Sequence, residues 1–333
     1  MIRLVQLQHG AVRRVALVEE PLLRLLSSAH SSIYELAQTA TSGDEKLPAV
    51  VQRLLTDERL DYGTVYTGRS PWRLLPPVDH PVDAARCLVS GTGLTHLGSA
   101  QNRQAMHAAT ESETDSMRMF RWGVEGGKPA PDKIGTAPEW FYKGCGTIIR
   151  APGAPLDVPP YAEDGGEEAE IAGAYLIGPD GRPYRIGMMI GNEFSDHKFE
   201  KRNYLNLAGS KVRTCSLGPE LVLDPSFGSV RGTVTIERAG KNFWSQPILT
   251  GETEMCHSLA NIEHHHFKFE THRRPGDLHV HYYGACSLSF GAGIALADGD
   301  VMAVSFENFG RPLRNPLRVV DGPNSPVVVQ PLA

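Results

Sequence analysis

The sequence predicts a mixed α+β protein in which strands and turns are abundant. Its 333 residues include 34 glycines and 24 prolines, which indicates many turns and a body rich in strands and loops. Between two apolar runs lies Pro179-Asp180-Gly181, which predicts a β-hairpin because proline presets φ and glycine accepts a positive φ. Near the N-terminus, residues that alternate as in a β-hairpin are followed by apolar residues at helical spacing, so we expect helices as well as strands.

The first eighty residues are predicted to form a small N-terminal α+β domain. Residues 1–20 alternate like a hairpin, and residues 22–40 and 44–57 carry apolar side chains at helical spacing. A proline-rich stretch over residues 75–81 is typical of a linker. Because 333 residues exceed the usual size of one domain, we predict a small domain of residues 1–80 and a main domain of residues 81–333.

The composition excludes several classes of protein. Apolar residues make up 41% and charged residues 21%, as in ordinary globular proteins, and the net charge of −5 argues against a nucleic-acid partner. No apolar run approaches the ~20 residues that a membrane span needs, so we expect no membrane partner. The start of the chain lacks the pattern of a signal peptide, and the five cysteines lack CxxC spacing. These features favour a cytoplasmic location.

Acidic residues at one end of the predicted hairpin are the best candidates for chemistry. Glu168 and Glu170 are two residues apart on a predicted strand, so they point to the same side, and Glu193 follows the returning strand. Neighbouring carboxylates resist ionisation, and a hard divalent cation removes that conflict because it prefers oxygen ligands. The alternative is a solvated acidic edge of the hairpin.

Other motifs carry less information. The predicted strand 84–90 leads into Gly91-Thr92-Gly93, but the third glycine of a dinucleotide-binding fingerprint is misplaced. His279 and His281 share one face of a strand, yet no third soft ligand lies nearby, which argues against zinc. Residues 100–135 are polar and predict a lid or insertion. A helix with apolar residues between 255 and 269 buries His266 on its apolar stripe.

Several spaced motifs together resemble the fumarylacetoacetate hydrolase superfamily, over about residues 85–320. The family has a Glu-x-Glu strand, an Asn-Asp-x-Ser segment, a lysine about twenty residues later, and a C-terminal Gly-Asp-x-Val followed by Asn-Pro. This chain has the corresponding elements Glu168/Glu170, Asn192-Glu193-Phe194-Ser195, Lys211, Gly218-Pro219, Gly299-Asp300-Val301 and Asn315-Pro316. The sugar-acid branch, which includes 2-keto-3-deoxy-aldonate dehydratases, is the more similar one.

The resemblance implies a mixed β-sandwich or β-roll that carries a divalent metal. By position, Glu168, Glu170 and Glu193 match the metal ligands, with Mg²⁺ as the expected ion and Mn²⁺ or Ca²⁺ as alternatives. Lys211 matches the active-site lysine and is expected to bind the substrate carboxylate or to act as a base, and His96 is the second catalytic candidate. A small 2-keto acid is the implied substrate, and a homodimer is the implied assembly.

Substrate binding is assigned to Lys143, Ala285 and Ser287, although the alternative for Lys143 is a surface charge. The chain departs from the family here, because Ala285 replaces a threonine and His197 replaces an arginine. The glutamate that pairs with the histidine in the hydrolases has no counterpart beside His96.

The missing glutamate weakens water activation, so the sequence favours a Mg²⁺-dependent dehydratase of a 2-keto-3-deoxy sugar acid. One alternative is a C–C bond hydrolase that acts on a 2,4-diketo acid of the acylpyruvate type. The other is a non-catalytic sugar-acid binding or regulatory protein, which the replacements at positions 285 and 197 motivate.

Overall fold

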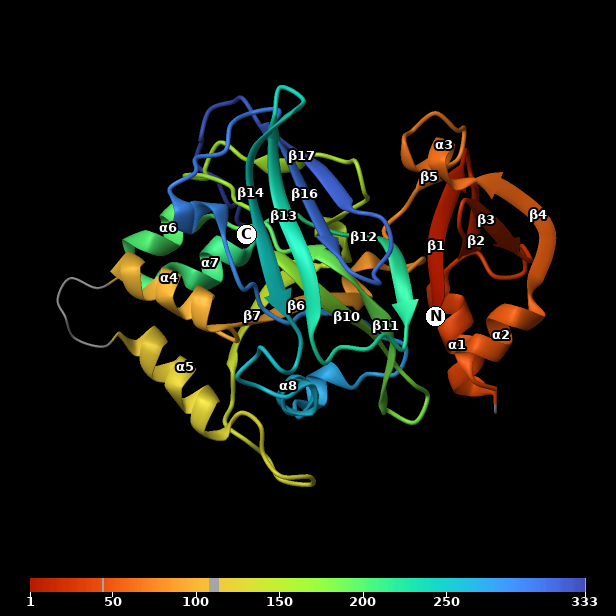
Figure 1. The fold of residues 1–333 in the computed structure, drawn as a ribbon, viewed down its shortest axis with the longest axis horizontal. Coiled ribbons are helices and arrows are strands. Elements are labelled where there is room, and N and C mark those ends of the chain that lie inside the picture. Colours follow the sequence, from red (N-terminus) through yellow and green to blue (C-terminus); the bar gives the residue numbers. More distant parts are fainter. Residues whose placement is uncertain (44, 108–113, 333) are drawn as a thin grey trace.

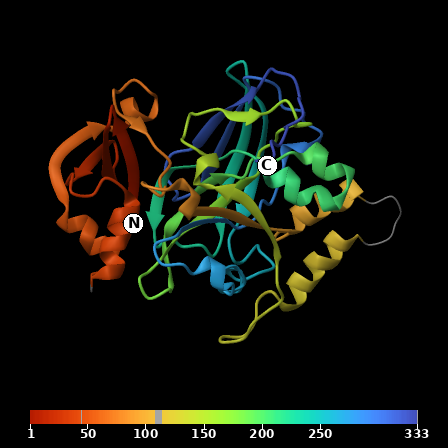
Figure 2. The same cartoon turned by 180° about the vertical axis from the view of Figure 1, so that it is seen from behind.

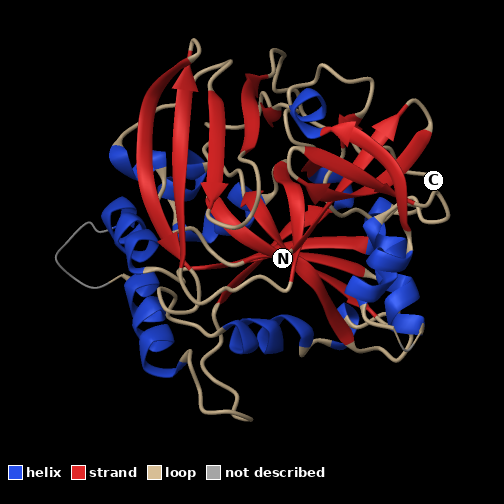
Figure 3. Cartoon of the chain, turned by 45° about the vertical axis from the view of Figure 1, so that its right-hand side comes forward, coloured by secondary structure: helices blue, strands red, loops and turns tan. Residues whose placement is uncertain are grey.

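A computed structural model describes residues 1–43, 45–107 and 114–332 of the chain. Its described residues form two mixed sheets, one of 12 strands and one of 5 strands. Figure 3 shows the strands in the centre of the molecule and the helices at its periphery. The predicted α+β class and the predicted mixed β architecture are confirmed.

The first eighty residues fold into strands backed by helices. In chain order they are β1 (Ile2–His9), β2 (Val12–Glu19), β3 (Leu22–Leu26), α1 (Ile33–Ser42), α2 (Leu47–Arg53), β4 (Leu55–Asp61), α3 (Tyr62–Tyr66) and β5 (Arg73–Leu74). Helix α1 begins at a capping box, in which Ser32 and Glu35 each satisfy the other's backbone N–H.

Two helix predictions in this segment are partly wrong. Residues 22–26 form β3, because this leucine-rich stretch pairs with β2 and alternates buried side chains into the core. The second predicted helix, over 44–57, ends at Arg53, and the next residues form β4 against β3. Residue 44 itself lies outside the described residues.

The N-terminal strands continue the large sheet of the main body. The strand order is β4-β3-β2-β1-β12-β11-β10-β15-β6-β7, and the junction is the antiparallel pair of β1 with β12, where Ile2 lies opposite Leu223. Figure 1 shows this unit in red and orange on one side of the molecule, and Figure 2 shows it from behind. The division into two domains at residue 80 stays a prediction.

The main body supplies the remaining strands of the large sheet and the whole of the second sheet. The second sheet has the order β14-β13-β16-β17-β9. The elements are β6 (Cys87–Gly93), α4 (Leu97–His107), α5 (Asp115–Gly126), β7 (Glu139–Cys145), β8 (Ile149–Arg150), β9 (Leu156–Val158), β10 (Ala169–Ile177), β11 (Pro183–Asn192), α6 (His197–Arg202), α7 (Leu207–Lys211), β12 (Cys215–Leu223), β13 (Val230–Arg238), β14 (Lys241–Thr250), α8 (Leu259–Phe267), β15 (Leu278–Tyr282), β16 (Val301–Phe306) and β17 (Leu313–Val319).

Some predicted boundaries in this region shift. The strand predicted over 84–90 begins at Cys87, after a 3₁₀ turn, and the helix predicted over 255–269 is confined to Leu259–Phe267. The predicted insertion over 100–135 contains α5 and part of α4, while residues 108–113 lie outside the described residues. Among the described residues, no helix has the length and apolar character needed to cross a membrane.

Strand β10 is the central element of the core. All nine of its residues are buried, because its two faces pack against different layers. Ala172 and Ala174 belong to the core shared with α1 and α2, whereas Ile171 packs with Val234 and Phe306 of the second sheet. The β10–β11 hairpin turns at the predicted Pro179-Asp180-Gly181, with Gly181 at φ +73°. The carboxylates described next lie at the far end of this hairpin.

Candidate metal centre

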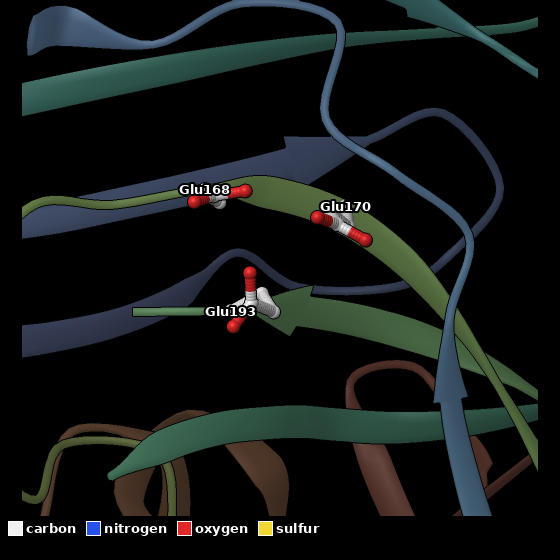
Figure 4. A group of neighbouring side chains, drawn as sticks. All are labelled: Glu168, Glu170 and Glu193. Carbon is white, nitrogen blue, oxygen red and sulfur yellow. The ribbon is translucent and has the colours of Figure 1, made fainter. Parts of the chain in front are cut away.

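The three glutamates that the sequence selected meet at the end of the β10–β11 hairpin. Each offers a carboxylate oxygen, and these oxygens all lie within 4.8 Å of one another. Exposed fractions are only 8% for Glu168, 2% for Glu170 and 0% for Glu193. Figure 4 shows Glu170 on β10, with Glu168 just before this strand and Glu193 just after β11. The alternative of a solvated acidic edge is therefore wrong.

The sheet register produces this convergence. Ala169 lies opposite Asn192, and Glu170 lies opposite Gly191. One step further, the Glu193 N–H donates to the Glu168 carbonyl at 2.9 Å, so these two residues face each other across the hairpin. Because alternate residues of a strand share a face, all three carboxylates project to the same side.

Glu168 is surrounded by cationic groups. Its Oε1 accepts a hydrogen bond from Lys211 Nζ and lies 3.1 Å from His197 Nε2. Burial raises the pKa of the Glu168 carboxyl, but the Lys211 ammonium and His197 outweigh burial and hold that pKa well below its usual value. Glu168 is therefore ionised at neutral pH.

Glu170 has the opposite electrostatic environment. Its Oε2 accepts a hydrogen bond of 2.7 Å from the backbone N–H of Gly284. Burial and the neighbouring carboxylates of Glu193 and Glu168 raise the pKa of Glu170 well above its usual value. A divalent cation placed among the three oxygens would remove this repulsion, so the donor set fits a hard cation such as Mg²⁺.

Lys211, the predicted active-site lysine, lies at the end of α7 and is 1% exposed. Its Nζ donates to Glu193 Oε2 at 2.6 Å as well as to Glu168 Oε1. Burial lowers the pKa of Lys211, but these two carboxylates outweigh burial and raise it. In this arrangement Lys211 is an ammonium, which suits anion binding.

Lys143 lies behind Glu193. It is fully buried, and its Nζ lies 2.5 Å from Glu193 Oε1. The same Nζ donates to the carbonyls of Phe194 at 2.6 Å and Lys211 at 2.9 Å. The alternative that Lys143 is a surface charge is therefore wrong, and its role in substrate binding stays a prediction.

A small cavity of about 20 Å³ opens beside the carboxylates, which is room for an ion or a water molecule. Of the predicted substrate-binding and catalytic residues, Ala285 lines this cavity, whereas Ser287 and His96 are not among its lining residues. The full lining consists of Gly93, Leu94, Ser99, Glu168, Glu170, His197, Glu200, Lys211, Ala285 and Leu288.

His96 lies among hydroxyl groups. Its Nδ1 lies 2.9 Å from Thr95 Oγ1, and its Nε2 lies 3.0 Å from Thr250 Oγ1. Burial lowers the pKa of His96 to about 4, so the ring is neutral at pH 7. Among the residues that the structure describes, no carboxylate lies within hydrogen-bond distance of either ring nitrogen. The catalytic role of His96 stays a prediction.

Sequence reasoning missed one acidic residue of the cavity. Glu200 is 2% exposed and lies on α6, three residues after His197. Residues three apart share a helix face, so both side chains reach the cavity from α6. The helix begins at His197 and is capped by Asp196. This spacing was the signal that could have identified Glu200.

Known proteins resemble this chain in structure. No family model matches it, and no curated protein matches it in sequence. The apo form of 2-keto-3-deoxy-D-arabinonate dehydratase superposes with a TM-score of 0.71 at 18% identity, over 96% of this chain and 100% of that chain. A structure of that enzyme complexed with magnesium and 2,5-dioxopentanoate gives a TM-score of 0.70 at 17% identity, with the same coverage.

A hydrolase shows the same likeness. Fumarylacetoacetate hydrolase from psychrophilic Exiguobacterium antarcticum superposes with a TM-score of 0.61 at 16% identity, over 96% of this chain and 100% of that chain. At such identities a match shows the fold. This chain therefore has the fold of the fumarylacetoacetate hydrolase superfamily, as the sequence motifs predicted.

Proposed function

We propose that this protein is a Mg²⁺-dependent dehydratase that acts on a 2-keto-3-deoxy sugar acid. The observation that carries the proposal is the buried group of three carboxylates, two of which Lys211 bridges. A dehydratase with the same fold, described as complexed with magnesium and 2,5-dioxopentanoate, supports this choice of reaction. Glu168, Glu170 and Glu193 would hold the ion.

The reaction needs few groups. A divalent ion held by Glu168, Glu170 and Glu193 would supply Lewis-acid stabilisation of the negative charge that develops on the keto oxygen of the substrate. The C3–H and C4–O bonds break, a C3=C4 double bond forms, and the proton and the hydroxyl leave as water. The Lys211 ammonium is positioned to bind the substrate carboxylate, and it serves as a base only after it has lost its own proton.

Glu200 supplies a further acidic group for this chemistry. It lines the cavity with Lys211 but lies outside the three-carboxylate group. A carboxylate in this place can accept a hydrogen bond from a substrate hydroxyl or exchange a proton with the departing hydroxyl. A polyhydroxylated substrate uses such a group, whereas the alkyl tail of an acylpyruvate does not.

Hydrolysis of a C–C bond is the second candidate, and the surroundings of His96 count against it. A histidine that activates water needs a group to orient it and to stabilise its positive form, and here Thr95 and Thr250 occupy that place. A non-catalytic sugar-acid binding protein is the third candidate. His197 and Ala285, the two positions at which this chain departs from the family, both line the cavity.

The deciding experiment is to incubate the purified protein with Mg²⁺ and each 2-keto-3-deoxypentonate and to follow product formation by NMR. Loss of water from one of them would support the dehydratase. Cleavage of an acylpyruvate with no dehydration would favour the hydrolase, and tight binding without turnover would favour the binding protein. The homodimer and the cytoplasmic location belong to the same proposal, and light scattering tests the dimer.

A further inference from the structure

The two oxygens of Glu193 have different lysine partners. Oε1 is held by Lys143 Nζ at 2.5 Å, and Oε2 is held by Lys211 Nζ at 2.6 Å. Lys143 is anchored, because the same ammonium also donates to the carbonyls of Phe194 and Lys211. It does not line the cavity. Oε1 of Glu193 is therefore held by an anchored lysine, whereas Oε2 is held by the lysine that lines the cavity.

Lys211 lies between two of the three clustered carboxylates. Its Nζ bridges Glu193 Oε2 and Glu168 Oε1, and its side chain lines the cavity with Glu168 and Glu170. A divalent ion held by the three carboxylates needs oxygens from the same two glutamates. An ammonium and a divalent cation on shared oxygens would lie a few ångströms apart in a buried site, where repulsion is poorly screened.

We propose that Lys211 is an internal cation that a divalent metal displaces, and that the displaced ammonium then binds the carboxylate of the substrate. This inference rests on the metal centre of the proposed function. Two of the three carboxylates that would hold the metal are the two that Lys211 bridges, so the metal and the ammonium compete for Glu168 and Glu193. Metal binding thereby releases the group that receives the anion.

The exchange couples two binding events. A metal must overcome the contacts of Lys211, so the lysine weakens metal binding while no anion is present. An anion that holds the released ammonium removes this penalty, so anion and metal strengthen each other's binding by the same factor. Lys211 is thus a positioning residue for the order of binding as well as a substrate contact.

The first test measures Mg²⁺ binding by isothermal titration calorimetry, with and without oxalate, a two-carboxylate analogue of a 2-keto acid. Without oxalate, Lys211→Met should bind Mg²⁺ about tenfold more tightly than wild type. Oxalate should tighten Mg²⁺ binding by about tenfold less in this variant than in wild type, because only its direct chelation of the ion remains. Lys198→Met is the matched control, because it removes an exposed positive charge from α6. It should behave as wild type in both titrations. Equal or weaker Mg²⁺ binding by a folded Lys211→Met protein would overturn the inference.

The second test needs no variant, so it can test the displacement of Lys211 even if Lys211→Met fails to fold. A crystal structure of the wild-type protein with Mg²⁺ should show Lys211 Nζ beyond hydrogen-bond distance from Glu168 Oε1 and Glu193 Oε2. Lys211 still bonded to both oxygens beside a bound Mg²⁺ would refute the displacement while leaving the proposed function intact. Displacement in a protein that dehydrates no sugar acid would refute only the function, and absence of Mg²⁺ binding would refute both.

Discussion

Glu168 and Glu193 face each other across the β10–β11 hairpin, and one ammonium group, that of Lys211, contacts both carboxylates. The hairpin register sets this pairing, since the Glu193 N–H donates to the Glu168 carbonyl at 2.9 Å. Like charges directly opposite each other destabilise a sheet unless a cation joins them. Lys211 is that cation, so the stability of this pair depends on a lysine from α7.

Glu170→Gln should weaken Mg²⁺ binding and stabilise the protein without metal. The substitution removes an expected ligand of the metal. Losing a residue that only hydrogen-bonds to a ligand already lowers metal affinity by about 10–100-fold, so we expect a loss of at least roughly a hundredfold here. Burial and the neighbouring carboxylates raise the pKa of Glu170, so a neutral amide relieves strain in the absence of the ion. Calorimetry measures the affinity, and thermal melting in a chelator measures the stability.

The control for this variant is Glu307→Gln, which neutralises an exposed glutamate. It should leave both quantities unchanged. Unaltered Mg²⁺ affinity in Glu170→Gln would contradict the assignment of Glu170 as a ligand.

Lys143→Met should destabilise the fold by about 3–5 kcal/mol, the usual cost of removing one partner of a buried ion pair. The change leaves Glu193 Oε1 and the Phe194 carbonyl without their buried donor. Urea unfolding measures the free energy. Lys198→Met, at an exposed position, should stay within about 0.5 kcal/mol of wild type. A loss below about 1 kcal/mol in Lys143→Met would mean that water replaces the lysine.

Stability should decrease as the pH falls below about 6.5, because three histidines are buried in the neutral form. His266, His279 and His281 pack against one another, and burial lowers the pKa of His279 and of His281 to about 3. Burial also lowers the pKa of His266. At these rings the unfolded chain takes up protons below about pH 6.5, whereas His279 and His281 in the folded chain do so only near pH 3. Acid therefore favours unfolding across that window.

The contribution of one histidine can be isolated. His281 lies between Ser90 Oγ and Thr92 Oγ1, at 2.9 Å and 2.7 Å, and a glutamine amide can bond to the same hydroxyls. His281→Gln should reduce the pH slope of the unfolding free energy between pH 6 and 4 by up to about 1.4 kcal/mol per pH unit. His264→Gln, at an exposed position of α8, is the control and should leave the slope nearly unchanged. An identical slope in His281→Gln and wild type would show that this ring is not buried neutral.

Glu200→Gln should separate metal binding from turnover. Glu200 lines the cavity but is not one of the three clustered carboxylates, so Mg²⁺ affinity should change little. If the carboxylate exchanges a proton with the substrate, kcat should fall by roughly a hundredfold or more. Steady-state kinetics with the active sugar acid measure the loss, and calorimetry checks the metal. A kcat equal to that of wild type would show that Glu200 takes no part in the reaction.

Much of the candidate site was visible in the sequence because it depends on local geometry. Glu168 and Glu170 share a face through the period of a strand, and Pro179-Asp180-Gly181 folds the hairpin that returns Glu193 to them. The order and spacing of the motifs then indicated the fold of the superfamily, which the structure matches.

Other features were decided only by tertiary structure. The sequence left Lys143 open between substrate binding and a surface charge, because nothing local shows that β7 places it behind Glu193. Leu22–Leu26 has apolar residues compatible with a helix, and pairing with β2 made it a strand. His96 follows a turn beside the site, yet contacts with Thr95 and Thr250 determine its environment.

The sequence by itself thus determined the class of fold, the acidic hairpin and the residues that meet at its end. Side-chain period and turn chemistry are properties of neighbouring residues, and a short stretch of chain contains them. Which charges are buried, which lysine bridges which carboxylates and which residues line the cavity depend on contacts between distant segments. Only packing of β7, β10, β11, α6 and α7 around one site decided these, because burial and charge pairing arise when those segments meet.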